Sequence, residues 1–105
     1  MHLLTPAKSF DEFRERLILL VDQYTQRRMQ FRSQEYDETL VRQDFINPLF
    51  VALGWDVANL SRQFGRNRQV VPEAKAVGRS DRPDYAFTVM GNVKFFVEAK
   101  RPSIP

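Results

Sequence analysis

The sequence predicts an α/β domain in which two helices precede a small sheet. Over residues 9–31 and 37–53, apolar side chains recur at intervals of three and four, the spacing of one helix face. From residue 69 onward, apolar residues stand in short runs, and Gly91-Asn92 separates the last two runs, which indicates a hairpin. The length of 105 residues suffices for one small domain.

A capping box opens the first helix. Ser9 is followed three residues later by Glu12, and such a pair satisfies the free amides at a helix N-terminus. One face then carries Phe10, Phe13, Leu17, Leu20, Val21 and Tyr24. Arg27 and Arg28 lie near the end, where positive charge complements the helix dipole. We therefore expect one amphipathic helix over this region.

The second helix is expected from Asp37 to Leu53. Asp37 is a good N-cap, and Gly54 is a natural stop because glycine readily adopts the left-handed conformation. Pro48 lies inside the pattern and has no amide hydrogen. The helix should therefore kink there, or restart with Asn47 as a cap and Pro48 in the first turn.

Three strands are expected after the helices, over residues 69–73, 85–90 and 93–100. The stretch before them, residues 61–68, is a basic loop. We divide the chain into an N-terminal amphipathic helix with its linker, residues 1–35, and a second part, residues 36–105, that holds the second helix and the sheet.

Acidic and basic side chains stand at the open end of the predicted hairpin. Glu98 and Lys100 alternate with apolar residues, so they project from one face of the last strand. Asp84 begins the neighbouring strand, and antiparallel pairing brings that start beside Glu98. Two close carboxylates repel unless they are well solvated or a cation lies between them. Because the chain has no cysteine, a metal here would have oxygen ligands, which favours Mg²⁺, Mn²⁺ or Ca²⁺.

The hairpin register decides between a metal site and solvated strand ends. If Gly91 and Asn92 are the only loop residues, Asp84 pairs with Ala99 and points away from Glu98. A metal site therefore requires an offset of one residue, from a three-residue turn or from a β-bulge near Asp84. A regular two-residue hairpin would count against the site.

The composition indicates where the protein is located and which partners it binds. The net charge is +3, and twelve of the sixteen basic residues are arginine, whose planar fork of donors suits phosphate. Residues 60–82 hold six basic and two acidic side chains. No apolar run approaches the roughly 18 residues of a membrane span, and the N-terminus lacks the apolar core of a secretory signal. We expect a cytoplasmic protein that does not bind membranes.

The stretches RPDYAF and FFVEAKRP, on either side of the hairpin, resemble the PD-(D/E)xK nuclease superfamily. The similarity extends to ETLVRQDFINPLFVALGWDV, residues 38–57. Together they resemble the N-terminal nuclease domains of type IIG (Eco57I-like) restriction-modification enzymes, with the type I motor subunit as a near relation. The resemblance implies a restriction-endonuclease-like core of helices packed on a small mixed sheet. That core is expected to be truncated after its third strand.

The resemblance also implies an activity, the Mg²⁺-dependent hydrolysis of DNA phosphodiester bonds, in which Mn²⁺ can substitute. Asp84 and Glu98 would bind the metal, and Lys100 would be the catalytic lysine. The backbone carbonyl of Ala99 and the carboxylate of Glu38 would be further ligands. Double-stranded DNA would be the substrate, and methyltransferase and target-recognition domains are expected in the full-length chain.

Two questions stay open at this point. Arg62, Arg66, Arg68 and Arg79 are candidates for contacts with DNA phosphates, with a solvated basic loop as the alternative. For the whole chain, the alternative is a non-catalytic DNA-binding or inter-domain module. In that case a bare sheet face and an unpaired edge strand would favour a homodimer.

Overall fold

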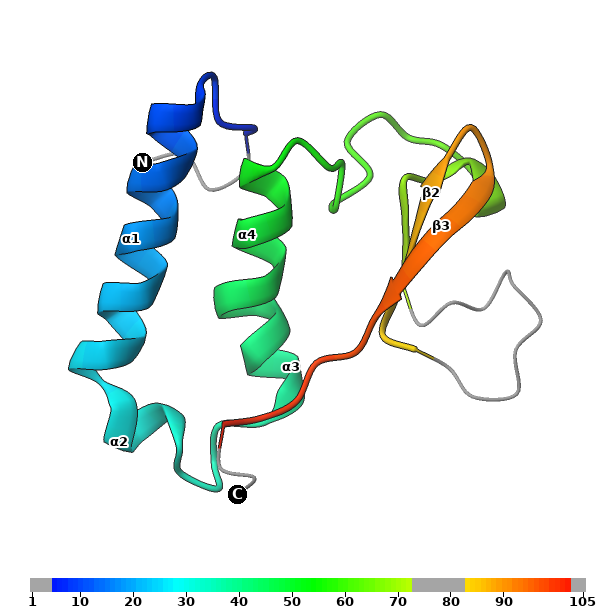
Figure 1. The fold of residues 1–105 in the computed structure, drawn as a ribbon. Helices are drawn as coiled ribbons and strands as arrows, with labels where there is room; N and C mark the ends of the chain where they lie inside the picture. The colour runs from blue at the N-terminus through cyan, green and yellow to red at the C-terminus, as the bar shows by residue number, and fades with distance from the viewer. Residues whose placement is uncertain (1–4, 73–82, 103–105) are drawn as a thin grey trace. The chain divides into compact units, whose positions relative to one another are not determined.

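The computed structural model describes residues 5–72 and 83–102 (Figure 1). The chain divides into two compact units. The helical unit comprises Met1–Gly54 and Ala99–Pro105, and the sheet unit comprises Trp55–Glu98. The predicted combination of helices with a small sheet is confirmed. The domain boundary after residue 35 stays a prediction.

The first predicted helix is two helices, α1 (Phe10–Gln26) and α2 (Arg28–Phe31). The break is at Arg27, whose ψ of 32° is not helical. Positions 24 and 31 of one straight helix would be about 10 Å apart along its axis. The break instead brings the buried Phe31 ring to 5.9 Å from the Tyr24 ring, centre to centre. Aromatic packing therefore outweighs the continuity of the helix.

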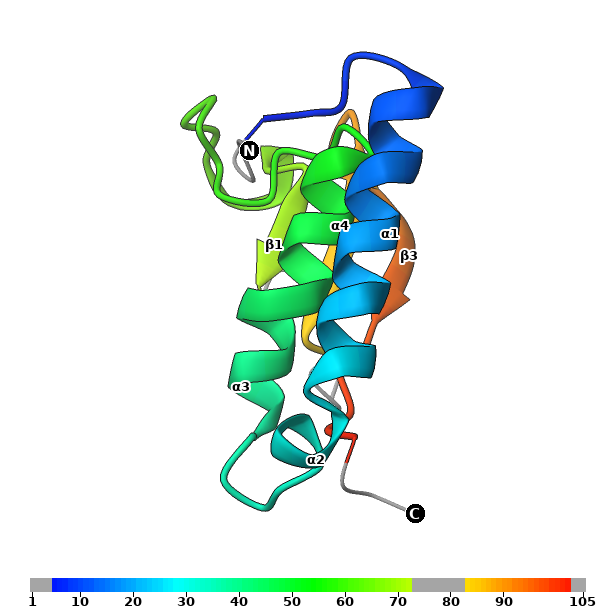
Figure 2. The ribbon, with the colours of Figure 1, turned by 90° about the vertical axis from the view of Figure 1, so that its left-hand side faces the viewer.

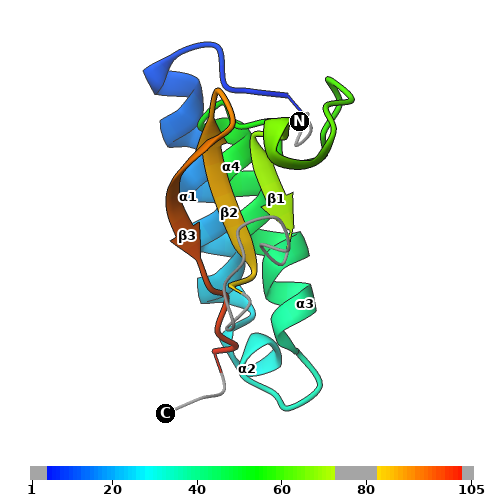
Figure 3. The same ribbon diagram turned by 90° about the vertical axis from the view of Figure 1, so that its right-hand side faces the viewer.

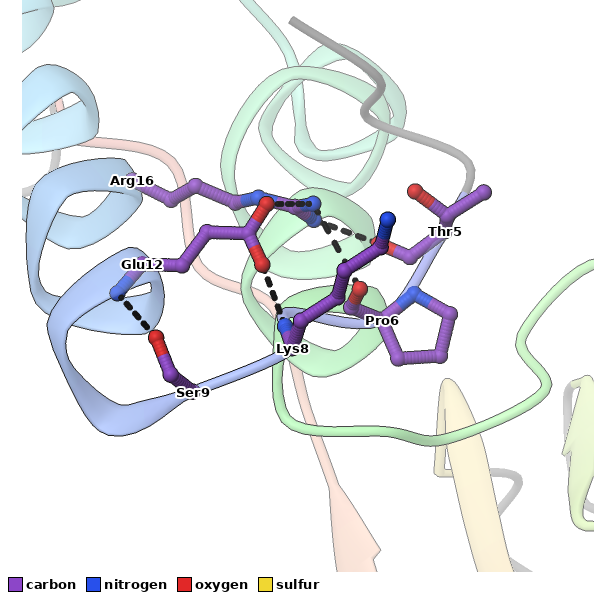
Figure 4. Close-up of polar contacts among 6 residues, drawn as sticks. All are labelled: Thr5, Pro6, Lys8, Ser9, Glu12 and Arg16. Atoms are coloured by element: carbon purple, nitrogen blue, oxygen red, sulfur yellow. Dashed lines mark hydrogen bonds and ion pairs between the residues drawn. The ribbon is translucent and has the colours of Figure 1, made fainter.

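The N-terminus of α1 is capped as predicted, but with a different second contact (Figure 4). Ser9 Oγ accepts a hydrogen bond from the Glu12 amide at 3.1 Å. The Glu12 carboxylate accepts from the amide of Lys8 rather than from that of Ser9. It also pairs with Arg16 at 3.3 Å, and Arg16 donates to the carbonyl oxygen of Thr5. These contacts tie the segment before α1 to its second turn.

The predicted apolar face of α1 is only partly covered. Phe10 and Val21 remain 76% and 55% exposed, whereas Arg16 is 6% exposed. An arginine can occupy a buried position when its long apolar stem packs and its guanidinium group finds acceptors. The periodicity therefore identified the helix correctly but misplaced part of its buried side.

The second predicted helix is continuous and consists of α3 (Glu38–Val41), the π-helical segment η1 (Arg42–Ile46) and α4 (Asn47–Ala52). Asp37 Oδ1 accepts from the Leu40 amide at 3.0 Å, so the predicted cap is confirmed. Gly54, with φ of +108°, follows its end as expected. Figures 1 and 2 show α4 lying alongside α1, and the Ala7 amide donates to the Ala52 carbonyl at 3.1 Å.

Pro48 changes the helix in a way that was not predicted. Asn47 has helical backbone angles and donates its amide to the Arg42 carbonyl, five residues back. Asn47 is therefore not a cap, although α4 begins at Asn47 and Pro48 lies in its first turn as expected. Proline removes an amide and crowds the carbonyl four residues earlier, and one wider π-helical turn accommodates both effects without ending the helix.

The helical unit has an aromatic core. Phe31, Tyr36, Val41 and Ala99 form its buried cluster. The Tyr36 hydroxyl lies 2.8 Å from Asp44 Oδ2, to which it donates. Burial, and next the hydrogen bond with Asp44, raise the pKa of the Tyr36 phenol well above its usual range. The hydroxyl is thus held as a neutral donor inside the core.

The sheet unit contains β1 (Val70–Pro72), β2 (Tyr85–Val89) and β3 (Asn92–Val97). Figure 3 shows β2 between the other two strands, and both pairings are antiparallel. All strand pairs among the described residues are thus antiparallel, whereas a mixed sheet was expected. A tight turn joins β2 to β3, and such a turn permits only antiparallel pairing.

Candidate functional site

The turn between β2 and β3 is made by Met90 and Gly91. Their φ angles are +52° and +82°, and two positive values are typical of a type I′ hairpin turn. The expected turn at Gly91-Asn92 was therefore wrong by one residue. A type I′ turn favours glycine at its second central position, so Gly91 takes that place and Asn92 becomes the first residue of β3, opposite Val89.

A β-bulge follows in β3. Thr88 pairs with Val93, but its neighbour Phe87 pairs with Phe95. Lys94 is the extra residue between these two pairs. A bulge of this kind shifts the register of all residues on its far side by one. The shift changes which residues stand opposite each other at the open end of the hairpin.

The bulge determines which residues stand opposite each other beyond the ladder. The last pair is Tyr85 with Val97, and the same register continued by one residue would set Asp84 opposite Glu98. Without the bulge, Asp84 would stand opposite Val97, and Glu98 would belong to the other face. The one-residue offset required by the metal hypothesis is thus present, although a bulge at Lys94 supplies it. Asp84 is half-buried and Glu98 is exposed.

The other candidate site residues belong to the helical unit. Glu38 is the first residue of α3. Ala99 is 2% exposed and packs in the same cluster as Val41, which lies one turn after Glu38. Lys100 is exposed and follows two residues after Glu98. The roles of Glu38, the Ala99 carbonyl and Lys100 stay predictions.

The four candidate arginines do not share one environment. Arg62 is exposed, with φ of +57°. Arg68 is half-buried, and its charge acts on Asp56. The side chain of Arg66 and the whole of Arg79 lie outside the described residues. Of the two candidate arginines whose side chains are described, Arg62 is therefore the more exposed.

Asp56 organises the basic loop, a role that was not predicted. Its carboxylate accepts from the Leu60 amide at 2.7 Å, the Ser61 amide at 3.0 Å and Ser61 Oγ at 2.6 Å. The Ser61 hydroxyl is the main cause that lowers the pKa of the Asp56 carboxyl, and the Arg68 charge contributes. Many loop turns contain an aspartate four or five residues before the groups that donate to it. The sequence alone therefore gave little indication of this role.

Substitution of Asp56 by asparagine is expected to loosen the loop. An amide offers one acceptor oxygen where the carboxylate satisfies three donors, and each lost hydrogen bond is worth about 1 kcal/mol, or roughly fivefold in a local equilibrium. Tryptic cleavage after Arg62 should therefore accelerate about fivefold or more. The exposed Asp22→Asn change on α1 is the matched control. Equal cleavage rates in both variants would contradict this role.

The same hydrogen bonds make the stability of the loop depend on pH. Because folding lowers the pKa of Asp56, its contribution is complete above the ordinary value of 3.8 and is lost as pH falls through the lowered value. The amide resonances of Leu60 and Ser61 should accordingly stay unchanged down to about pH 4 and shift only below it. A shift centred above pH 4 would contradict the assignment.

Two negative findings concern the described residues alone. Within residues 5–72 and 83–102, no three histidine, cysteine, aspartate or glutamate side chains gather closely enough to hold a metal ion. A Mg²⁺ site often needs only one or two carboxylates completed by water, so this finding leaves the pair Asp84 and Glu98 as a candidate. None of the helices in that part of the chain has the length and apolar character of a membrane span.

Comparison with known proteins gives one informative match. Over 95 residues, the chain is 38% identical to the type II restriction enzyme and methyltransferase RM.Eco57I of Escherichia coli. The chain is similar to part of a restriction enzyme. The match covers 87% of this chain but only 10% of RM.Eco57I, so the chain spans about a tenth of the length of that relative. No family model and no solved structure matches the sequence.

The match agrees with the resemblance seen in RPDYAF and FFVEAKRP as far as the kind of relative is concerned. RM.Eco57I combines restriction and methylation, and a chain covering one tenth of it corresponds to one part of such a protein. The assignment of this part to the PD-(D/E)xK nucleases stays a prediction.

Proposed function

We propose that this chain is the DNA-cleaving module of a restriction-modification enzyme. The observation that carries the proposal is the β3 bulge, which gives the strand pairs Tyr85–Val97 to Phe87–Phe95 the register that, continued by one residue, would set Asp84 opposite Glu98. The similarity to RM.Eco57I supports the same class of substrate, double-stranded DNA. Methyltransferase and target-recognition domains would then occupy other parts of the full-length protein and select the DNA site.

The donor set fits a hard divalent cation. Asp84 and Glu98 offer carboxylate oxygens, which Mg²⁺ and Mn²⁺ prefer, and water molecules would complete the coordination. A bound Mg²⁺ would supply Lewis-acid activation of water and charge neutralisation at the scissile phosphate. Lys100 would orient the attacking water or take up its proton.

A metal titration tests the proposal. Calorimetry with Mn²⁺ should show binding to the chain in roughly the micromolar to millimolar range, as expected for an oxygen-only site. Glu98→Gln keeps the shape but removes the charge, and we expect binding to weaken at least about tenfold, since one of two anionic ligands is lost. Asp84→Asn should do the same.

The control is Glu15→Gln, an exposed glutamate on α1, which should leave Mn²⁺ binding unchanged. Circular dichroism establishes that each variant is folded. Binding that survives both Glu98→Gln and Asp84→Asn, or a folded chain that binds no Mn²⁺, would contradict the metal site.

The alternative is a non-catalytic DNA-binding or inter-domain module, and one observation favours it. Among the described strands β3 is an edge of the sheet, and its Val93, Phe95 and Phe96 are each more than a third exposed. An apolar edge strand is suited to pairing with another strand, including one from a second copy. Loss of the metal site together with concentration-dependent dimerisation in sedimentation experiments would support this alternative.

A further inference from the structure

Residues 56–69 form a closed loop within the sheet unit. Its two ends meet, because the Asp56 amide donates to Gln69 Oε1 at 2.9 Å. Asn59 and Gln63 join across the middle through two hydrogen bonds of 3.0 Å, from Gln63 N to Asn59 Oδ1 and from Asn59 Nδ2 to the Gln63 carbonyl. Thr88 of β2 donates its amide to the Gln69 carbonyl at 2.8 Å. Compact loops with this organisation are frequently functional.

The loop presents an exposed phenylalanine in a basic setting. Phe64 is 88% exposed and Leu60 is 68% exposed, although the surrounding backbone is held by the hydrogen bonds above. Arg62 is exposed two residues before Phe64. Residues 56–69 contain three arginines and one acidic residue, Asp56, whose carboxylate is engaged by Leu60 and Ser61. Charge complementarity therefore favours a polyanion as the partner of this loop.

We propose that the loop of residues 56–69 is a DNA-contact element in which Arg62 binds a backbone phosphate and Phe64 packs as a wedge against base pairs in the minor groove. Proteins that contact this groove frequently insert an apolar side chain between base steps beside arginine contacts to the backbone. This inference rests on the proposed function for its substrate, duplex DNA, but adds a site outside the carboxylate pair.

The position of the loop suits a second contact with the same duplex. The loop is attached to β2 at Thr88, four residues from Asp84, and four residues of a strand span about 13 Å. This span joins the attachment point of the loop, not Phe64 itself, to Asp84, and both belong to the sheet unit. Arg62 and Phe64 would hold the duplex at a fixed distance from the carboxylates, so the loop would position the scissile phosphate without reading sequence.

The test measures DNA binding without metal. Fluorescence anisotropy with a labelled duplex, in EDTA and low salt, gives Kd for the wild-type chain and its variants. Phe64→Ala should weaken binding about tenfold, the scale measured when an aromatic side chain is removed from a base. Phe64→Trp should restore it. Duplexes containing 2-aminopurine should brighten on binding to the wild type, because the base unstacks, and stay dark with Phe64→Ala.

Arg62 is tested by the salt dependence of the same Kd. Arg62→Asn removes the charge with a residue that tolerates the left-handed backbone at this position. The slope of log Kd against log salt should fall by about one if one phosphate contact is lost. The matched controls are Phe10→Ala and Arg14→Gln, exposed residues of α1, which should leave both Kd and the slope unchanged.

Two outcomes would overturn the inference: a wild-type chain that binds no duplex, or a Kd unaffected by Phe64→Ala, whether or not that variant loses self-association. Loss of self-association with unchanged DNA affinity would assign the loop to protein contacts. Because EDTA removes metal, failure here leaves the Mn²⁺ titration of Glu98 to decide the proposed function. Conversely, a chain that binds DNA through Phe64 but binds no Mn²⁺ would contradict the proposed function but not the proposed role of the loop.

Discussion

Replacement of Lys100 by alanine is expected to lower DNA cleavage by the whole protein about 10²–10⁴-fold, the range for a group that assists proton transfer. Lys100 is exposed and lies two residues after Glu98, the proposed ligand. Mn²⁺ binding should be unchanged, because an ammonium group is not a metal ligand. Loss of cleavage with unchanged Mn²⁺ binding would distinguish Lys100, a catalytic group, from Asp84 and Glu98, the proposed metal ligands.

A second substitution separates the two ways in which Lys100 could act. Lys100→Arg keeps the positive charge, but a guanidinium group does not give up its proton in proteins. Partial recovery of cleavage would indicate that Lys100 acts by charge, and no recovery would indicate proton transfer. Lys8→Ala, at an exposed lysine before α1, is the control. Wild-type cleavage by Lys100→Ala would refute a catalytic role.

Replacement of Phe87 by alanine should destabilise the sheet unit by about 3–5 kcal/mol, the usual cost of emptying a buried aromatic position. Phe87 is 0% exposed. Its ring stacks on Phe95 at 4.6 Å and meets the edge of Trp55 at 5.0 Å, measured between centroids. Phe87 pairs with Phe95 directly beside the bulge at Lys94. Its loss should therefore also destabilise the strand register on which the proposed opposition of Asp84 and Glu98 depends.

Urea unfolding followed by tryptophan fluorescence measures this effect, because Trp55 is the chain's one tryptophan and contacts Phe87. The control is Phe96→Ala, whose side chain is already 36% exposed. It should cost clearly less, since less apolar surface leaves a buried environment. Equal shifts of the midpoint in the two variants would show that the Phe87 cluster is not the core of the unit.

The features predicted correctly were local. Ser9, Asp37 and Gly54 act on backbone groups within about four residues, so their pattern is visible in the sequence itself. Hydrophobic periodicity located both helical regions for the same reason. The candidate site was predicted only as a pair of short motifs, and the resemblance to nucleases rather than the spacing assigned its chemistry.

The features that were missed depend on partners distant in the chain or on packing. Arg16 is buried because the segment before α1 folds back to accept from its guanidinium group, and periodicity cannot anticipate that contact. The break at Arg27 follows from the stacking of Phe31 on Tyr24. The role of Asp56 depends on a loop closed by Gln69, thirteen residues later.

The sequence by itself determined the class of fold, the two helical regions, the hairpin and the identity of the acidic and basic residues at its open end. Only the tertiary structure decided the register. The turn at Met90-Gly91 and the bulge at Lys94 each shift the pairing, and together they pair Tyr85 with Val97, the register on which the proposed opposition of Asp84 and Glu98 depends. The physical reason is that side chains alternate faces with a period of two, so a shift of one residue separates or joins two carboxylates.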